Sequence, residues 1–337
     1  MNKYVSISTE TTLAFGATLK TTFKSSVRAA CHSSGLAACA GAVMMVSSSA
    51  QAQNLFASDY YSGNIYEYTP GGVRSTFATG LSDPFGFAFD SAGNLFEADG
   101  NESGLGTGSI YEFTPGGARS TFATGLATPY GLAFNGAGNL FEADGSSGHI
   151  YEFTPSGVRS TFASGLSVPT GLAFNSAGIL FAADANSGNI YEYTPGGVRS
   201  TFATGLSSAY GLAFDSAGNL FVAAPGSGIG NGNIYEYTPA GVRTTFATGL
   251  DQPEGLAFNS AGDLFEADQL SNNIYEYTPG GVRSTFASGL NNPIALVFQG
   301  VALPVPEPST LGLLAAGITA LFVHRRRRGD TTTLRSH

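Results

Sequence analysis

Carboxylates recur at fixed places along the middle of the chain. A short apolar run beginning Leu-Phe closes on an aspartate in five copies, and Ala224 takes its place in a sixth. The aspartates are Asp59, Asp99, Asp144, Asp184 and Asp268. A ring of carboxylates on one loop face would attract calcium, which prefers oxygen ligands. Alternatively, each aspartate accepts backbone N–H groups in its own loop, as in an Asx turn. We favour the second interpretation and expect no cofactor, with Ca²⁺ as the alternative.

Three glutamates stand two residues before such an aspartate: Glu97, Glu142 and Glu266. We expect them to add to the negative charge of the same loop face.

A second set of positions varies where the rest of the repeat is nearly constant. One residue precedes each Gly-(Leu/Phe)-Ala-Phe run or its altered copy, namely Phe85, Tyr130, Thr170, Tyr210, Glu254 and Ile294. Glu254 alone among them is ionisable, and it is the candidate catalytic residue if the chain is an enzyme. The aromatic members could stack on sugar rings or pack against one another.

His149 is the one histidine between residues 53 and 300. It could act as a general base. It occupies a position that holds Asn or Ser in the other repeats, and we interpret it as a substitution in an exposed loop.

The motif Ile-Tyr-Glu-(Tyr/Phe)-Thr-Pro shows that these residues belong to a repeat. Its six copies begin at Ile65, Ile110, Ile150, Ile190, Ile234 and Ile274. In the second repeat we expect four strands, at 86–89, 95–98, 110–113 and 118–123, separated by turns rich in Gly, Pro, Asn and Asp. Four short strands in about 40 residues are typical of a propeller blade.

The phase of the repeat predicts a closed ring. The series begins with the last three strands of a unit and ends with a lone first strand around Ala295–Phe298. That strand can complete the first blade. The sequence therefore predicts an all-β, six-bladed β-propeller over residues 53–300, closed by its two ends.

Glutamate and arginine recur on the last two strands of every unit. If the Pro70-Gly71 pair centres the hairpin turn, Glu67 lies opposite Arg74, and the other repeats follow suit. We expect these cross-strand pairs to contribute about 0.2–1 kcal/mol each.

The N-terminal part, residues 1–52, reads as a secretory signal. Basic residues precede an apolar run from Gly35 to Val46, and Ala50-Gln51-Ala52 offers a small-x-small cleavage site. Both cysteines, Cys31 and Cys39, fall in this part. We therefore expect a processed protein without disulfides or thiol chemistry.

The body between Asn54 and Gly300 is acidic. It carries six Arg, no Lys and 21 Asp plus Glu, a formal charge of −15. Such a surface repels phosphate backbones, so nucleic acid is not an expected partner.

The C-terminal part, residues 301–337, contains Pro306-Glu307-Pro308, an apolar segment 311–323 and an Arg cluster 325–328. This order resembles the PEP-CTERM sorting signal of exported proteins in Gram-negative bacteria that make exopolysaccharide. The resemblance implies an exosortase-type processing enzyme as a partner and only transient contact with the inner membrane, through the tail. It also implies a final location at the cell surface, on the outer membrane or in the extracellular matrix.

The repeat unit itself, Gly-Leu-Ala-Phe followed by Gly-Asn-Leu-Phe and Asn-Ile-Tyr-Glu-Tyr, resembles NHL and related six-bladed propeller repeats. The gluconolactonase-like members of that group hold a divalent metal with several inward Glu, Asp and Asn ligands. Here the acids and amides of the first turn, such as Asp90 and Asn135, lie at the opposite end of the first strand from Glu254.

Two functions remain open on sequence grounds. The first is an exported, non-enzymatic binding or scaffold module associated with envelope components, a polysaccharide matrix or a surface protein, with Phe85, Tyr130, Thr170, Tyr210 and Glu254 at the binding mouth. The second is a secreted metal-assisted hydrolase or lyase that uses Glu254, with His149 as a further candidate.

Overall fold

The computed structural model describes residues 8–12, 18–22, 53–100 and 106–300. The first two ranges are strands β1 (Ser8–Thr12) and β2 (Thr18–Thr22), which pair antiparallel in the N-terminal unit of residues 1–48. The predicted cleavage site and the C-terminal tail lie outside the described residues. No helix among the described residues is long and apolar enough to cross a membrane.

The second unit contains six antiparallel sheets of four strands each. The first three blades consist of β26 (Pro293–Phe298), β3 (Leu55–Asp59), β4 (Asn64–Tyr68) and β5 (Arg74–Ala78); β6 (Pro84–Phe89), β7 (Leu95–Asp99), β8 (Gly108–Phe113) and β9 (Arg119–Leu126); and β10 (Pro129–Phe134), β11 (Leu140–Asp144), β12 (His149–Phe153) and β13 (Arg159–Ala163).

The remaining three blades consist of β14 (Pro169–Phe174), β15 (Leu180–Asp184), β16 (Asn189–Tyr193) and β17 (Arg199–Ala203); β18 (Leu212–Phe214), β19 (Leu220–Ala224), β20 (Gly232–Tyr237) and β21 (Arg243–Leu250); and β22 (Pro253–Phe258), β23 (Leu264–Asp268), β24 (Asn273–Tyr277) and β25 (Arg283–Ser288).

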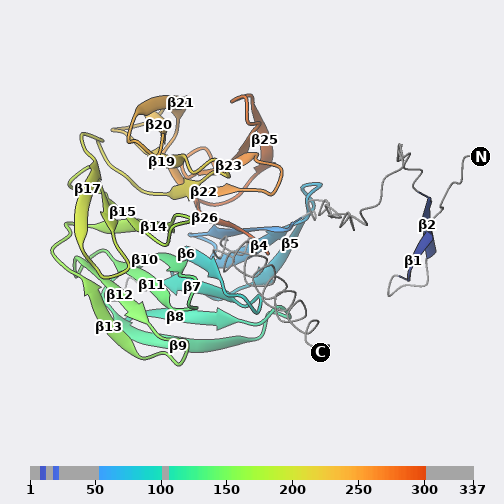
Figure 1. Cartoon of the computed structure of the whole chain (residues 1–337), viewed down its shortest axis with the longest axis horizontal. Coiled ribbons are helices and arrows are strands. Elements are labelled where there is room, and N and C mark those ends of the chain that lie inside the picture. The colour runs from blue at the N-terminus through green and yellow to red at the C-terminus, as the bar shows by residue number, and fades with distance from the viewer. Residues whose placement is uncertain (1–7, 13–17, 23–52, 101–105, 301–337) are drawn as a thin grey trace, which may run out of the picture. The chain divides into compact units, whose positions relative to one another are not determined.

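The ring closes as the repeat phase predicts. Strand β26 pairs antiparallel with β3, with Phe298 opposite Leu55 and Pro293 opposite Asp59. Figure 1 shows β26 beside the blue strands that begin the propeller. The prediction of a six-bladed β-propeller, closed by an exchange between the two ends, is confirmed.

The hydrophobic core lies between the blades. The second strand of each blade is buried along its whole length, so both of its faces carry apolar side chains. Phe96 on β7 meets Phe122 and Phe134 edge to face, each at a centroid distance of 5.0 Å. The same aromatic cluster recurs between every pair of neighbouring blades. Each blade is therefore stabilised by aromatic packing against both of its neighbours.

Glycine lets the innermost strands touch backbone to backbone. A Cβ atom on Gly86 would lie 2.0 Å from the carbonyl oxygen of Tyr130 in the next blade. At the closing seam Ala295 takes the place of this glycine. Ser58 links the two innermost strands there. Its Oγ accepts a hydrogen bond from the Ala295 N–H at 2.8 Å and donates one to the Phe85 carbonyl at 3.3 Å.

The expected Glu–Arg ladder is wrong by one residue. Three residues form the hairpin turn, because Gly72 adopts a left-handed φ of 77° and adds a residue after Pro70 and Gly71. Glu67 therefore lies opposite Ser75, and Tyr68 lies opposite Arg74.

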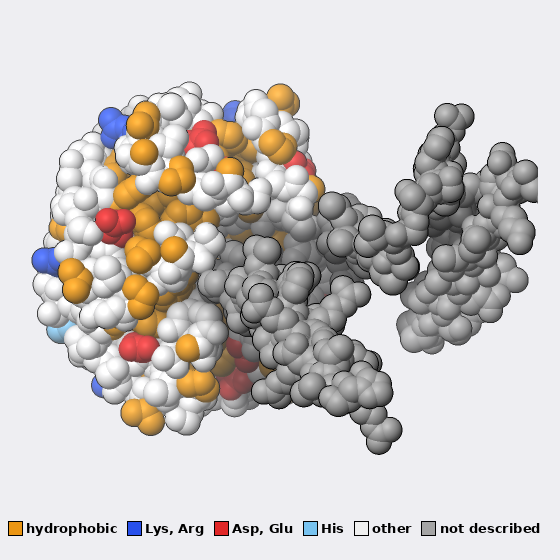
Figure 2. All heavy atoms as spheres, in the orientation of Figure 1, with side chains coloured by type: hydrophobic (Ala, Val, Ile, Leu, Met, Phe, Trp, Pro, Cys, Tyr) orange, Lys and Arg blue, Asp and Glu red, His pale blue; other side chains and the backbone are white. Residues whose placement is uncertain are grey.

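Each of these arginines stacks on a tyrosine of the third strand instead. The guanidinium carbon lies 4.8–5.0 Å from the ring centroid in all six blades. In three blades the glutamate next to that tyrosine accepts a hydrogen bond from the asparagine directly before the second strand, as where Asn139 Nδ2 donates to Glu152 at 2.7 Å. Figure 2 shows arginine side chains at the margin of the face it presents, with apolar side chains gathered toward the middle.

Candidate functional site

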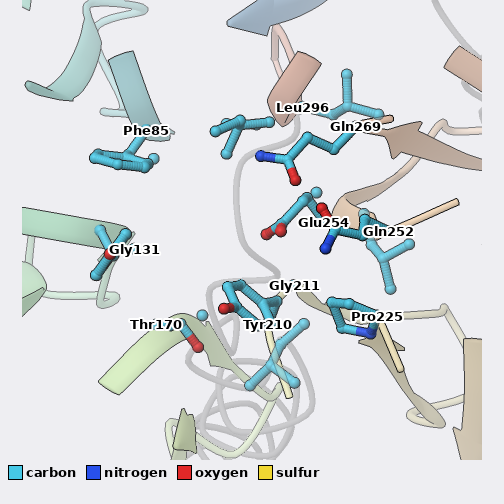
Figure 3. A pocket seen from close by; sticks show the side chains of 18 of the residues that line it. Phe85, Gly131, Thr170, Tyr210, Gly211, Pro225, Gln252, Glu254, Gln269 and Leu296 are labelled. Atoms are coloured by element: carbon cyan, nitrogen blue, oxygen red, sulfur yellow. The ribbon is translucent and has the colours of Figure 1, made fainter. Parts of the chain in front are cut away.

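The variable residues of the six innermost strands come together at one mouth of the central channel. They line a cavity of about 490 Å³ and lie at the start of each first strand. The six predicted positions all line this cavity: Phe85, Tyr130, Thr170, Tyr210, Glu254 and Ile294. Figure 3 shows Phe85, Tyr210 and Glu254 projecting from different blades toward the same space.

An arc of aromatic rings forms one wall of the cavity. Tyr60 lies 5.3 Å from Phe85, and Phe85 lies 4.5 Å from Tyr130, measured between ring centroids. Tyr61 continues the arc at 5.2 Å from Tyr60 but is largely exposed. The repeat pattern did not predict Tyr60 and Tyr61 as mouth residues. They directly follow Asp59, at the place where Gly100 and Gly145 stand in the next two blades.

Amide side chains line the side nearer Glu254. Gln269 Nε2 donates a hydrogen bond to Asn292 Oδ1 at 2.9 Å, and Gln252 lies beside Glu254 (Figure 3). Gln252 and Asn292 hold left-handed φ values of 68° and 72°, which are uncommon for residues other than glycine. Such strain occurs often at binding sites, where the surrounding fold maintains it. Sequence reasoning missed these amides, because nothing in the repeat marks a left-handed glutamine.

Among the described residues that line this mouth, Glu254 is the one carboxylic acid and none is Lys, Arg or His. Burial raises the pKa of Glu254 to about 8. Burial also raises the pKa of Tyr210 to about 12 and that of Tyr130 above its ordinary value, with the charge of Glu254 as a further cause in both. At neutral pH the mouth therefore holds a protonated carboxyl and neutral phenols.

In the five blades that have the recurrent aspartate, its carboxylate binds the backbone just before the first strand. The Asp144 carboxylate accepts N–H bonds from Ala127 at 2.7 Å, from Thr128 at 3.2 Å and from Ser147 in its own loop at 3.1 Å. The aspartate therefore accepts backbone N–H bonds, as expected. Most of the donors are not in its own loop, however, but lie 16–17 residues earlier, just before the first strand of the blade. Asp59, Asp99, Asp184 and Asp268 accept equivalent bonds.

The blade that lacks this aspartate differs at the cavity. Ala224 ends the second strand of the fifth blade, and its first strand, β18, has three residues where the others have six. Ser208, Pro225 and Gly226 of this blade line the mouth. Ala224, in the place of the recurrent aspartate, was therefore the signal in the sequence that the cavity wall beside Tyr210 differs from that of the other blades.

The expectation for Glu97, Glu142 and Glu266 is wrong. These side chains are fully buried between blades, and neither carboxyl oxygen of any of them has a hydrogen-bond partner. Burial, followed by the charge of the nearby aspartate, raises the pKa of each carboxyl well above its ordinary value. They are not part of a negative loop face.

His149 lies away from the channel mouth. The expectation of an exposed loop is wrong, because His149 is the first residue of strand β12 and pairs in register with Asp144. Its partly buried ring stacks on Tyr151 at a centroid distance of 5.5 Å. It does not line the cavity and cannot reach Glu254 as a catalytic partner.

The fold defines a six-bladed, NHL-like propeller with a cavity at one channel mouth. The family model described as "SMP-30/Gluconolactonase/LRE-like region" matches residues 45–258, and the chain belongs to this family. A second model, the PEP-CTERM protein-sorting motif, matches residues 304–328. That motif indicates export in a Gram-negative bacterium, transient anchoring through the C-terminus and processing by an exosortase-type enzyme.

Solved structures confirm the fold. A chain of the nidogen/laminin complex is 21% identical, with 73% of this chain and 98% of that chain covered and a TM-score of 0.64. Virginiamycin B lyase from Staphylococcus aureus is 16% identical over 71% and 85%, with a TM-score of 0.53. A gluconolactonase-family structure is 16% identical over 62% and 79%, also with a TM-score of 0.53. No curated protein matches the chain.

The divalent metal of gluconolactonase-like relatives does not fit this mouth. Glu254 is its single carboxylate, and the Asn292 Oδ1 atom already accepts a hydrogen bond from Gln269. Throughout the described ranges, no three His, Cys, Asp or Glu side chains gather closely enough to hold a metal ion. Calcium at the recurrent aspartates stays an untested prediction.

Proposed function

We propose that this exported propeller is a non-enzymatic binding module that takes a glycan segment at the channel mouth. The observation that carries the proposal is the composition of the cavity. Aromatic rings line one wall, amides and a protonated carboxyl line the other, and no nucleophile–base pair stands among them.

This combination suits a sugar ring. The faces of Phe85, Tyr130 and Tyr210 offer apolar area for the C–H face of a pyranose. Gln252, Gln269 and Glu254 offer hydrogen-bond donors and acceptors for its hydroxyl groups. Pockets that combine a mostly apolar lining with a few placed polar groups are typical of small-ligand sites.

The sorting motif supports the place of action. We infer that the processed propeller stays at the cell surface or in the extracellular matrix, where polysaccharide is at hand. A surface protein is the alternative partner, and it would use the same exposed mouth.

The test is binding of a neutral oligosaccharide to the full chain held in lipid nanodiscs. Calorimetric titration with the N-acetylglucosamine tetramer should give a measurable affinity that Tyr130→Ala or Tyr210→Ala weakens about tenfold, equal to about 1.4 kcal/mol. Tyr151→Ala, on the outer part of a blade, is the matched control and should leave the affinity unchanged. Absence of binding by this tetramer and by its glucosamine counterpart would refute the proposal, as would equal losses in all three variants.

Family membership favours a second candidate, a secreted metal-assisted hydrolase or lyase that uses Glu254, although the described residues of the mouth offer a divalent metal only one carboxylate. A carboxyl with a pKa of about 8 could serve as a general acid near neutral pH. Screening lactones and esters with added Ca²⁺, Mn²⁺ or Zn²⁺ tests this candidate. A turnover that Glu254→Gln abolishes would favour it over the binding module.

A further inference from the structure

The charge around Glu254 is one-sided. The titratable groups that face it are Tyr210 from the neighbouring blade, Tyr130 across the channel and Glu266 on the adjacent strand β23, and none of them carries positive charge. Among the described residues, no basic side chain lines the mouth and none forms a hydrogen bond with the Glu254 carboxyl. Burial alone accounts for its raised pKa. The carboxyl is therefore available to a group on the ligand.

The arginines of the propeller cannot supply a positive charge at the mouth. All six stand on the outermost strands, where each guanidinium stacks on a tyrosine ring at 4.8–5.0 Å. The body between Asn54 and Gly300 has a formal charge of −15. A field of this sign raises the local concentration of cations and repels anionic sugars from the mouth.

The aromatic arc fits the same kind of ligand. The faces of Tyr60, Phe85 and Tyr130 carry the negative part of the ring quadrupole, and Tyr210 stands between them and Glu254 in the ring order. Ammonium groups are attracted to aromatic faces of this kind.

We propose that the glycan bound at the mouth carries an ammonium group, that of an amino sugar, which enters the aromatic arc and pairs with the Glu254 carboxylate. This inference rests on the proposed glycan binding and names the chemical class of the sugar. Without ligand, Glu254 is protonated at neutral pH, whereas the ion pair with an ammonium group requires the ionised carboxylate. Binding therefore releases the proton of the Glu254 carboxyl to solvent.

The proton gives the pairing a direct signature. With a free pKa of about 8, Glu254 is mostly protonated at pH 7. A bound cation lowers that pKa, so between about 0.5 and 1 proton is released for each ligand bound. The affinity for a ligand of fixed positive charge should increase as the pH rises from 6 to 8, because less work is needed to ionise the carboxyl.

The experiment compares two tetramers on the full chain in lipid nanodiscs. One is N,N,N-trimethylglucosamine, whose charge does not change with pH, and the other is neutral N-acetylglucosamine. Calorimetry at pH 7 in two buffers of different ionisation enthalpy measures the protons released. We expect the cationic tetramer to bind at least tenfold more tightly and to release a proton. Glu254→Gln should lose both the preference and the proton release, whereas Glu142→Gln, a buried glutamate in another blade, should keep both.

Three results would overturn the inference, and the first two differ in whether glycan binding fails with it. If both tetramers bind equally and without proton release, the amino-sugar assignment fails while glycan binding stands. If neither tetramer binds, the proposed function fails together with the inference. Proton release that persists in Glu254→Gln would also refute the pairing, because the proton would then come from another group.

Discussion

In the third blade, the ring of Tyr130 occupies the space that a side chain on Gly145 would need. A Cβ atom on Gly145 would lie 2.4 Å from a ring carbon of Tyr130, so the aromatic ring can cross the loop only because residue 145 has no side chain. Gly100 and Phe85 stand in the same relationship one blade earlier, at 2.5 Å. The sixth blade has no aromatic residue at this position, and Gln269 stands in the loop beside Glu254. Tyr210 departs from the pairing, because Pro225 and not glycine stands at its loop position. In the second and third blades the position of the aromatic ring therefore depends on a glycine in the loop.

Gly145→Ala should therefore displace the Tyr130 ring. We expect ligand affinity to fall about tenfold, about 1.4 kcal/mol, with a cost in stability of about 1–3 kcal/mol from overpacking. Gly136→Ala is the control in the same blade, because a Cβ atom there meets nothing within 4 Å. Calorimetry and urea unfolding measure the two effects, and equal behaviour of the two variants would contradict the proposed shape relationship.

The buried glutamates should make the propeller less stable as the pH rises. The folded pKa of Glu142 lies well above its ordinary value of 4.5, so the folded state keeps a proton that the unfolded state releases. The free energy of unfolding therefore decreases as the pH rises from about 4.5 toward the raised pKa. Glu142→Gln should be more stable than the parent by about 1–3 kcal/mol at pH 8 and nearly equal to it at pH 4.

Urea unfolding between pH 4 and pH 9 measures this effect. Glu152→Gln is the control, because its carboxyl is partly exposed and binds Asn139. A pH dependence that is identical in Glu142→Gln and in the parent would show that the buried carboxyl does not titrate as inferred.

Asp144 should be needed to hold the start of strand β10. Asp144→Ala leaves the N–H groups of Ala127, Thr128 and Ser147 without their acceptor. We expect a loss of about 1–3 kcal/mol and faster amide exchange at Ala127 and Thr128. Asp144→Asn, which keeps one acceptor oxygen, should lose less. Unchanged exchange in the alanine variant would mean that the carboxylate does not hold this segment.

Arg159 should couple to Tyr151 and not to Glu152. The guanidinium stacks on the Tyr151 ring at 5.0 Å, whereas Glu152 lies opposite Ser160. Double-mutant cycles should give a coupling of about 0.5–1 kcal/mol for the stacked pair and close to zero for the Arg159–Glu152 pair. A larger coupling in the second cycle would restore the ladder that the turn geometry excludes.

The repeat alone was sufficient to predict the fold, its closure and the six positions at the mouth. The register of the outer hairpin was not predictable from spacing, because one left-handed glycine, Gly72, shifts the pairing by a residue. The burial of Glu97 was missed for another reason. It shares a strand face with Asp99, but only the aspartate, at the strand end, reaches backbone donors, whereas Glu97, in the middle of the strand, is buried without a partner.

The most direct test of the account is a crystal structure of the protein with an amino-sugar tetramer bound. The account predicts one sugar ring against Tyr130 and Tyr210 at the channel mouth, with its nitrogen within hydrogen-bond distance of a Glu254 carboxyl oxygen. A tetramer bound along the outer strands, with the mouth left to water, would contradict it.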